Sequence, residues 1–384
     1  MRFFEQILVS YGWEGLALAG ALLLMFGVQL YYYIFVYGRI SGYRNNNRKV
    51  LLEQEPPVSV IVPLFSEDYS FVEERLPLIL AQAYPHFEVV IVYVGHDVDF
   101  FEDLSQLRQS FPQITTTRIQ LDPRYPISRK MALNVGIKSA HCEHLIFTST
   151  DAVPQTDRWL SLMAKGFMRG DIVVGYCGVE RLKGFANYLM RTWRLMHSAD
   201  WIARAVRNRP YRGTLHNLGF TKRLYFGAHG FNYLNMNVGE DDLFMQQIMT
   251  RENVSVILSP RATLREKTWG GMRWWLNQLR YYGSAFRYYP GDVKCFVRWE
   301  SGSRILFFLT VLCALAVMPL EYKLGAVLLV LIRYGVVLWE VRRVVRRLGE
   351  EGILGRYFMY DLISPLLTAV LGITLLRRDE RVWR

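Results

Sequence analysis

The sequence predicts an α/β protein with a mostly parallel sheet, flanked by transmembrane helices on its N- and C-terminal sides. Between about residues 53 and 303, short apolar runs alternate with helical patterns, which is typical of strands covered on both faces. Outside this stretch, long uncharged apolar runs approach the roughly 20 residues that cross a bilayer. The length of 384 residues is enough for two or three structural units of about 150 residues each.

The composition excludes several classes of protein. Lys and Arg (46) outnumber Asp and Glu (34), and 51% of the residues are hydrophobic, which excludes a disordered chain. A net charge of +12 with 14% aromatic residues leaves nucleic acid or an anionic membrane surface as the natural partner. The four cysteines have neither the close spacing of a metal or redox motif nor histidine partners, so we expect free, buried thiols. They are Cys142, Cys177, Cys295 and Cys313.

The first membrane helix is predicted near the N-terminus, because no charged residue occurs from Gly15 to Gly38. Tyrosines 31–33 at its far end suit an aromatic interfacial belt. Four basic residues follow without an acid, at Arg39, Arg44, Arg48 and Lys49. The positive-inside rule makes this flank cytoplasmic and places the N-terminus outside.

Near the C-terminus, residues 305–320 and 324–339 form two apolar runs that predict a helical hairpin. Arg333 lies within the second run and is costly there unless it is paired or faces protein. A last apolar segment, residues 358–376, contains Asp361 and Pro365 and ends in two arginines. Another crossing would place those arginines outside, so we expect an interfacial or re-entrant helix. The predicted units are therefore residues 1–50, a cytoplasmic domain of residues 51–303, and residues 304–384.

Within the domain the sequence predicts strands over 58–64, 88–94 and 144–148, and helices over 71–83 and 130–140. Ligands of such sheets bind beyond the carboxyl ends of the strands. This rule directs attention to residues 64–67, 95–97 and 148–152.

Two groups of acidic residues suggest chemistry. Asp151 lies just beyond a predicted strand, where a carboxylate can hold a divalent cation against phosphates, although a turn or helix-capping role is as common. Glu240, Asp241 and Asp242 precede a helical pattern. They match the helix dipole, but three clustered acids also suit a general base, because their mutual repulsion raises a pKa.

Six segments in order resemble a known family. They are Val58-Ser-Val-Ile-Val-Pro63, Arg129-Lys130-Met-Ala-Leu-Asn134-Val-Gly-Ile, Leu145-Ile-Phe-Thr-Ser149-Thr-Asp151-Ala-Val-Pro154, His216-Asn217-Leu-Gly-Phe-Thr-Lys222, Gly239-Glu240-Asp241-Asp242-Leu and Trp275-Leu-Asn-Gln278-Leu-Arg280. Together they resemble membrane-anchored bacterial glycosyltransferases of family 2, which are inverting enzymes with the GT-A (nucleotide-diphospho-sugar transferase) fold. The resemblance covers about residues 57–289 and extends to the flanking membrane helices.

The resemblance implies transfer of a sugar from a nucleotide-sugar donor to a glycan or lipid-linked acceptor, in cell-envelope glycan synthesis at the cytoplasmic face of the inner membrane. Asp241, or its neighbour Asp242 with Glu240 beside it, would supply the catalytic base. Asp151 would hold Mg²⁺ or Mn²⁺. The implied donor-binding residues are Pro63, Lys130, Asn134, Ser149, Asp151, Gln278 and Arg280.

The sequence also departs from the family pattern. Ser149 stands where the first Asp of the Asp-x-Asp metal motif is usual, which implies a looser metal site. Val94 lies where the family has an acidic pair that recognises the base, and Asp97 lies too far along to replace it. Tyr281 and Tyr282 occupy the Arg-Trp positions of the processive synthases, so we expect a non-processive enzyme. These departures favour an alternative, a catalytically degenerate domain that acts as a membrane scaffold.

Aromatic and basic residues interleave over residues 182–207 and 269–289. Such stretches stack single-stranded nucleic acid in some proteins. In a membrane-tethered chain, interfacial helices with rings at the headgroup level are the stronger interpretation. We therefore expect membrane lipids, and no nucleic acid, among the partners.

Overall fold

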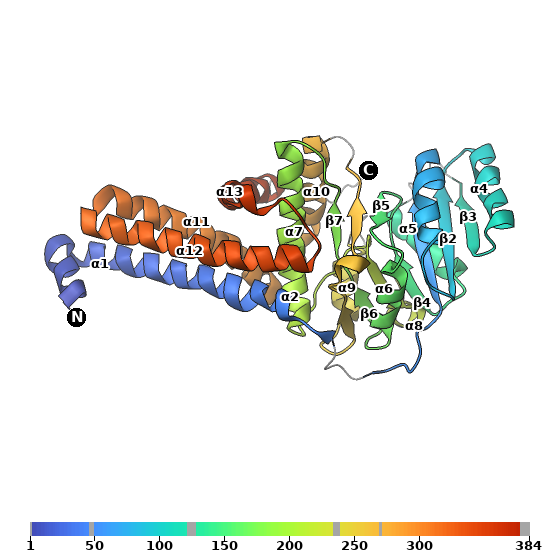
Figure 1. Cartoon of the computed structure of the whole chain (residues 1–384), viewed down its shortest axis with the longest axis horizontal. Coiled ribbons are helices and arrows are strands. Elements are labelled where there is room, and N and C mark those ends of the chain that lie inside the picture. Colours follow the sequence, from blue (N-terminus) through green and yellow to red (C-terminus); the bar gives the residue numbers. More distant parts are fainter. Residues whose placement is uncertain (1, 46–49, 121–127, 233–238, 269–270, 377–384) are drawn as a thin grey trace.

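The computed structural model describes residues 2–45, 50–120, 128–232, 239–268 and 271–376, with side chains over 12–368 of these ranges. Three long helices form a rod at one end of the molecule, and an α/β domain forms the other end (Figure 1). Arg48, Lys49, Trp269 and the arginines at 377 and 378, which the sequence analysis considered, lie outside the described residues.

A seven-stranded sheet forms the centre of the domain, in the order β3-β2-β1-β4-β8-β6-β9. Its strands are β1 (Val58–Leu64), β2 (Phe87–Val94), β3 (Ile114–Ile119), β4 (His144–Phe147), β6 (Ile172–Val174), β8 (Leu218–Thr221) and β9 (Val254–Val256). Every neighbouring pair is parallel except those of β8, which runs antiparallel to both β4 and β6. The prediction of an α/β domain with a mostly parallel sheet is confirmed.

The two faces of this sheet belong to two separate hydrophobic cores. Successive side chains of a strand point to opposite faces, so Ile61 of β1 joins one core while Val60 and Val62 join the other. Helix α5 (Arg129–Ser139) covers the first face, and η3 (Phe71–Arg75) with α3 (Leu76–Leu80) belongs to the second core. The remaining short elements are α4 (Val98–Ser110), α6 (Trp159–Phe167), α8 (Lys222–Gly227), α9 (Leu243–Ile248) and η4 (Pro260–Ala262).

A second, three-stranded sheet has the order β5-β10-β7. Its strands are β5 (Ala152–Pro154), β10 (Leu264–Glu266) and β7 (Cys177–Val179). It continues directly from the end of β4, and the amide of Lys267 donates to the carbonyl of Asp151 at 2.9 Å. This small sheet therefore carries the chain from the end of a central strand toward residues 264–267.

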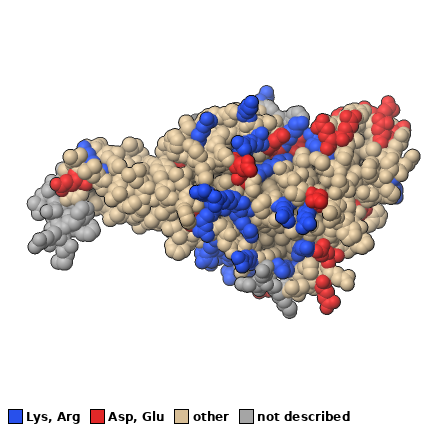
Figure 2. All heavy atoms as spheres, viewed as in Figure 1, with Lys and Arg blue, Asp and Glu red and all other residues tan. Residues whose placement is uncertain are grey.

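The rod consists of α1 (Arg2–Leu30), η1 (Tyr31–Tyr37), α2 (Gly38–Gly42), α11 (Gly291–Val317) and α12 (Leu320–Arg347). Three helical stretches in the described residues are long and apolar enough to cross a membrane, namely Gly12–Gly42, Gly291–Val317 and Leu320–Arg347. They contain the predicted spans 15–38 and 324–339, whereas the helix that matches the predicted run 305–320 begins earlier, at Gly291, and ends at Val317. In Figure 2 the rod shows few charged side chains, whereas Lys and Arg gather where the rod meets the domain.

Helices α7 (Phe185–Val206), α10 (Gly271–Phe286) and α13 (Tyr357–Leu376) lie at the junction of the rod and the domain (Figure 1). Helix α13 packs against α7, α10 and α11, and η5 (Leu354–Arg356) leads into it. The interfacial interpretation placed the aromatic rings of this segment at the surface, in the lipid headgroups. The rings of Trp193 and Trp201 on α7 are instead buried in the protein. The interfacial placement of these helices, like the unit boundaries at residues 50 and 303, stays a prediction.

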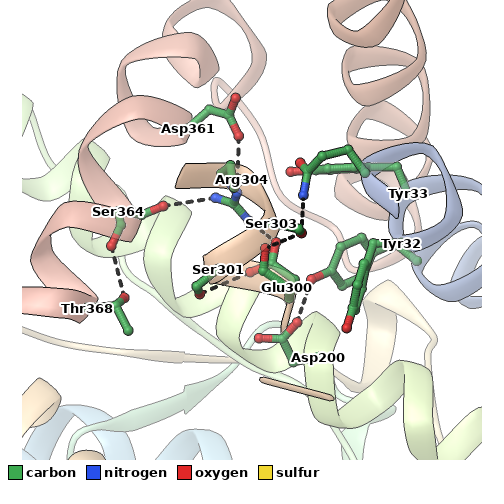
Figure 3. Close-up of polar contacts among 12 residues, drawn as sticks. Tyr32, Tyr33, Asp200, Glu300, Ser301, Ser303, Arg304, Asp361, Ser364 and Thr368 are labelled. Atoms are coloured by element: carbon green, nitrogen blue, oxygen red, sulfur yellow. Dashed lines mark hydrogen bonds and ion pairs between the residues drawn. The ribbon is translucent and has the colours of Figure 1, made fainter. Parts of the chain in front are cut away.

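An ionic cluster lies between the helices of the rod and α13. It consists of Glu300, Arg304, Arg333 and Asp361, all of them buried. Arg333 donates to both carboxylate oxygens of Asp361, at 2.6 and 3.1 Å, so the costly arginine predicted from the sequence is paired. Figure 3 shows Arg304 of α11 between Asp361 and Ser364 of α13, with Glu300 close by.

The cysteines are free, as predicted, but only partly buried. Cys177 is buried, whereas Cys295 and Cys313 are exposed on α11. Both exposed thiols lie in a stretch long and apolar enough to cross a membrane.

Candidate active site

The three acids of Glu240, Asp241 and Asp242, which we call the acidic loop, lie buried just before α9. Gly239 precedes them with a φ of 112°, a conformation that side-chain-bearing residues rarely adopt. The glycine turns the chain inward, and the amide of Gly213 donates to the carbonyl of Asp241 at 3.0 Å. As a result the three acids are only 1%, 4% and 2% exposed.

Asp242 has a structural role in this loop. Its carboxylate accepts from the amide of Leu243 at 2.6 Å, which caps α9, and from the hydroxyl of Tyr289 at 2.6 Å. Burial and the charge of Asp241 raise the pKa of Asp242. Because both of its oxygens are engaged, Asp242 is the member least available to accept a proton from a ligand.

Glu240 and Asp241 are only partly satisfied. Glu240 Oε2 accepts from the Tyr281 hydroxyl at 3.3 Å, and Asp241 Oδ2 accepts from Arg212 at 3.4 Å. The other oxygen of each is buried and has no hydrogen-bond partner among the described residues. Burial raises the pKa of Glu240 to about 7, against the lowering effect of Arg129. Such a combination of burial and unmet hydrogen-bonding capacity is typical of functional sites.

Basic residues surround the acidic loop. Arg129 and Lys130 come from the first turn of α5, and the charge of Glu240 acts on the pKa of both. Burial lowers the pKa of Lys130. Arg212 lies over the ring of Tyr282, 4.1 Å from its centroid, and contacts Tyr289 and His197 at 3.4 and 3.2 Å. Arg212 belongs to none of the six sequence motifs and was not among the predicted site residues.

A second buried carboxylate, Glu266 of β10, is fully paired. Arg194 donates to it at 2.6 Å, and His216 lies at 3.5 Å. Burial by itself would raise the pKa of Glu266, but Arg194, His216 and Arg129 lower it to about 2. Arg129 therefore acts on both Glu240 and Glu266, which places the acidic loop and the small sheet around one region.

Asp151 and Ser149 lie at the end of β4, as predicted, and both are half-buried. The Ser149 hydroxyl oxygen and that of Thr148 are buried without a hydrogen-bond partner among the described residues. The described residues contain no group of three or more His, Cys, Asp or Glu that would hold a metal ion. One carboxylate and a nearby hydroxyl nevertheless fit a cation of the Mg²⁺ type, which takes one or two protein carboxylates and completes its shell with substrate phosphates and water.

The other predicted donor-binding residues differ in their surroundings. Pro63 is buried in β1 opposite Val92, and Asn134 accepts from the Tyr225 hydroxyl at 3.3 Å. Gln278 and Arg280 lie on α10, where Arg280 is exposed.

Two acids far apart in the sequence, Glu67 and Asp97, meet at the end of β2 through Tyr93. The Tyr93 hydroxyl donates to Glu67, and the amide of Asp97 donates to Tyr93 at 3.2 Å. Asp97 itself caps α4 through the amide of Phe100 at 2.9 Å. Tyr93 thus brings the carboxylate of Glu67 to the strand end where Val94 offers none. The contact between Tyr93 and Glu67 could not be read from the sequence, because Glu67 follows the neighbouring strand β1 and lies 26 positions from Tyr93.

Comparisons with known proteins bear on the fold. No protein-family model matches the sequence, and no curated protein matches it. Among solved structures, the chain is similar to the mannosyltransferase PcManGT from Pyrobaculum calidifontis in complex with GDP-Man and Mn²⁺. The identity is 18% and the TM-score is 0.55, over 91% of this chain and 98% of that one. This chain has the fold of a glycosyltransferase.

Two further solved structures are more distant. S. aureus TarS 1–349 in complex with UDP-GlcNAc is 15% identical with a TM-score of 0.42, over 85% of this chain and 93% of that one. GalNAc-T7 with UDP, GalNAc and Mn²⁺ is 12% identical with a TM-score of 0.44, over 66% and 53%. Of these three structures the mannosyltransferase supports the fold predicted from the ordered motifs, and its similarity extends over nearly the whole of both chains.

Proposed function

We propose that this chain is a membrane-bound, inverting glycosyltransferase that moves a sugar from a nucleotide-sugar donor to an acceptor hydroxyl. The observation that carries the proposal is the acidic loop, where Glu240 and Asp241 each keep one buried oxygen without a partner among the described residues. This loop belongs to a fold shared with a mannosyltransferase solved with GDP-Man and Mn²⁺. The residues that would carry the reaction are those of the acidic loop and of the first turn of α5.

Asp241 is the proposed base. Arg212 donates to one of its carboxylate oxygens at 3.4 Å, while the second oxygen has no hydrogen-bond partner among the described residues. In the proposed step the acceptor hydroxyl gives its proton to Asp241, and its oxygen attacks the anomeric carbon. The bond from that carbon to the nucleoside diphosphate breaks on the opposite side, which inverts the configuration.

Glu240 is the proposed electrostatic neighbour of the base. With a pKa of about 7, it changes its charge near neutral pH, directly before the proposed base in the chain. Tyr281 holds one of its oxygens. We propose that the third acid, Asp242, acts as the N-cap of α9 and not in the reaction.

The leaving diphosphate needs positive charge. Lys130 and Arg129 at the start of α5 are the proposed protein contacts, because a helix N-terminus adds a favourable dipole for anions. Asp151, with the Ser149 hydroxyl beside it, would hold a Mg²⁺ or Mn²⁺ ion that neutralises phosphate charge. The other proposed donor-binding residues are Gln278 and Arg280 on α10, Pro63 on β1 and Asn134 on α5.

The proposed setting is the cytoplasmic face of the inner membrane. The candidate spans, the exposed arginines at the end of α12 and the basic residues after α2 support this orientation under the positive-inside rule. The acceptor would be a glycan or a lipid-linked sugar, and transfer would be non-processive. We propose the units 1–50, 51–303 and 304–384 as anchor, catalytic domain and C-terminal membrane region.

The test is a transfer assay on the purified full-length chain. We would incubate it with a panel of nucleotide sugars and a lipid extract, with Mg²⁺ or Mn²⁺, and measure release of nucleoside diphosphate. The proposal predicts release with at least one donor and loss of release in Asp241→Asn. Absence of release with every donor and either metal, from a folded protein, would contradict it.

A specific observation favours the alternative, a domain that binds a partner without catalysing transfer. Ser149 replaces a usual metal carboxylate, and the described residues contain no group of three metal-ligating side chains. Under this alternative, Asp241→Asn keeps the biological role of the chain, whereas an enzyme loses it.

A further inference from the structure

A cavity of about 560 Å³ lies apart from the acidic loop, between η3–α3, the small sheet and the turn after α12. Its wall includes Glu74 and Arg75 from the helix, Val153 and Gln155 from the region of β5, and Gly349 and Glu351 after α12. We call it the side cavity. None of Glu240, Asp241 and Asp242 lines it, whereas the amide of the lining residue Lys267 donates to the carbonyl of Asp151, the proposed metal ligand, at 2.9 Å.

The lining of the side cavity is rich in cations. Five of its side chains are basic and three are acidic. The basic ones are Arg75, Arg181, Arg191, Arg265 and Lys267. Alternation along β10 explains part of this pattern, because Arg265 and Lys267 share one face while Glu266 points to the other, toward Arg194.

Arg75 is the most unusual member. It is only 3% exposed, and its Nη2 donates to Asp68 at 2.6 Å and to Ser70 at 2.8 Å. Its Nε and Nη1 groups are buried and have no hydrogen-bond partner among the described residues. A buried guanidinium with two unused donors is costly, and this arginine lines the cavity.

Arg191 and Arg265 compete for one carboxylate. Both donate to Glu350, Arg191 at 2.8 Å, and Glu350 is fully buried as a side chain. The Nε of Arg191 also lacks a partner among the described residues. One carboxylate therefore faces two guanidiniums at the back of the cavity, and their remaining printed contacts are to the backbone carbonyls of Glu351 and Gly349.

We propose that the side cavity binds a ligand that carries a phosphate group. Several guanidiniums in one wall match the planar, forked hydrogen bonding that phosphate oxygens accept. A volume of about 560 Å³ exceeds what a phosphate ion needs and is within the range of about 300–1,000 Å³ found for small-molecule sites. The ligand is therefore a phosphate ester with an attached group about the size of a sugar or a glyceride backbone. The lining contains no aromatic side chain, so a stacked nucleobase is not the expected occupant.

The position of the cavity relates it to the membrane. Gly349 and Glu351 line it, and they follow within four residues of Arg347, the last residue of a stretch able to cross a membrane. Four residues of extended chain reach at most about 14 Å. A phosphate ester from a lipid headgroup is therefore within reach, as is a soluble sugar phosphate, and the experiment separates the two sources.

The test uses the full-length chain in detergent micelles. Binding of glucose 1-phosphate and of short-chain phosphatidic acid is measured by titration calorimetry, with short-chain diacylglycerol as the lipid control without a phosphate group. GDP and UDP are present in excess to occupy the proposed donor site. Arg75→Gln and Lys267→Gln remove lining cations, and Arg223→Gln changes an exposed arginine on α8 that lies outside the lining. Arg75→Lys serves as a second variant if Arg75→Gln does not fold.

The proposal predicts saturable binding that survives excess GDP and UDP. It also predicts affinity about tenfold weaker in Arg75→Gln and Lys267→Gln, because a charge-assisted hydrogen bond is lost, with Arg223→Gln unchanged. Tighter binding of phosphatidic acid would identify a lipid source, and tighter binding of the sugar phosphate a soluble one. The proposal would be overturned if no saturable binding were seen, or if excess GDP and UDP abolished it. It would also be overturned if Arg75→Gln and Lys267→Gln bound as tightly as Arg223→Gln.

Discussion

Two groups of buried charges differ in how completely their carboxylates are satisfied, although the Nε groups of Arg304 and Arg333 in the first group also lack a hydrogen-bond partner among the described residues. In the ionic cluster of the rod and α13, both oxygens of Asp361 accept from Arg333. Glu300 accepts from Arg304 and, at 3.2 Å, from Ser301. In the acidic loop, Glu240 and Asp241 each leave one buried oxygen without a partner among the described residues. Both regions are almost inaccessible to solvent, so exposure does not explain the contrast.

The contrast separates structural charges from functional ones. A balanced, hydrogen-bonded cluster holds helices together, because removing one partner leaves an uncompensated buried charge. Figure 3 shows this arrangement, with side chains of α11 and α13 turned toward one another. An unbalanced group of acids is costly to the fold and is typically retained for the chemistry that it performs.

The largest expected effect is on catalysis in the acidic loop. Asp241→Asn removes the proposed base but keeps its size, so we expect transfer to fall by about 10²- to 10⁴-fold with the thermal midpoint retained. Initial rates of nucleoside diphosphate release would measure the loss. Asp171→Asn, whose carboxylate pairs with the exposed Arg223 at 3.0 Å, is the matched control and should keep full activity. Equal rates in the Asp241 variant and the control would remove Asp241 from the mechanism.

The second effect concerns the ionic cluster and is on stability. Asp361→Asn leaves Arg333 without its carboxylate, which should cost about 3–5 kcal/mol and lower the thermal midpoint in detergent. The double variant Asp361→Leu with Arg333→Met removes both charges, and we expect it to recover most of the lost stability. If the single variant were as stable as the parent chain, the cluster would not hold α13 in place.

A smaller effect is expected from Arg129→Gln, because Arg129 lowers the pKa of Glu240. The raised pKa of Glu240 makes a contribution to stability that is full below its usual value of 4.5 and is lost as pH rises through about 7. Without Arg129 this loss should extend to higher pH, because the pKa of Glu240 rises further when the neighbouring positive charge is removed. Thermal midpoints between pH 5 and 9 would show the displacement, and a loss at the same or lower pH would argue against the contact.

The smallest effect is expected from Tyr281→Phe. The hydroxyl donates to Glu240 over 3.3 Å, and a hydrogen bond contributes about 0.5–1.5 kcal/mol. We expect a thermal midpoint within a few degrees of the parent chain and a slight further rise in the pKa of Glu240, because the charged carboxylate loses a donor. The same pH series measures both. A fall in stability as large as that of Asp361→Asn would show that Tyr281 acts mainly in packing.

The sequence predicts the apolar parts of this molecule well and its polar contacts poorly. Strands β1, β2 and β4 lie within a residue of their predicted ranges, because continuous apolar runs need burial on both faces. Helix α4 and β3 were missed, since their polar residues give no such run. The clustering of the three acids of the acidic loop could be read from the sequence, but the contacts of Arg212, Tyr281 and Tyr289 with them could not. These residues lie 29 to 47 positions from their partners, and only the tertiary fold brings them together.

The measurement that tests the central claim most directly compares Glu240→Gln with Asp361→Asn by thermal midpoint at pH 5 and pH 8. At pH 8 Glu240 is ionised at a cost to the fold, since its pKa is raised to about 7. We therefore expect Glu240→Gln to raise the midpoint at pH 8 and leave it nearly unchanged at pH 5. Asp361→Asn should lower the midpoint at both. If Glu240→Gln lowered the midpoint at pH 8 as Asp361→Asn does, the acidic loop would be a structural cluster like that of the rod, and the account would be wrong.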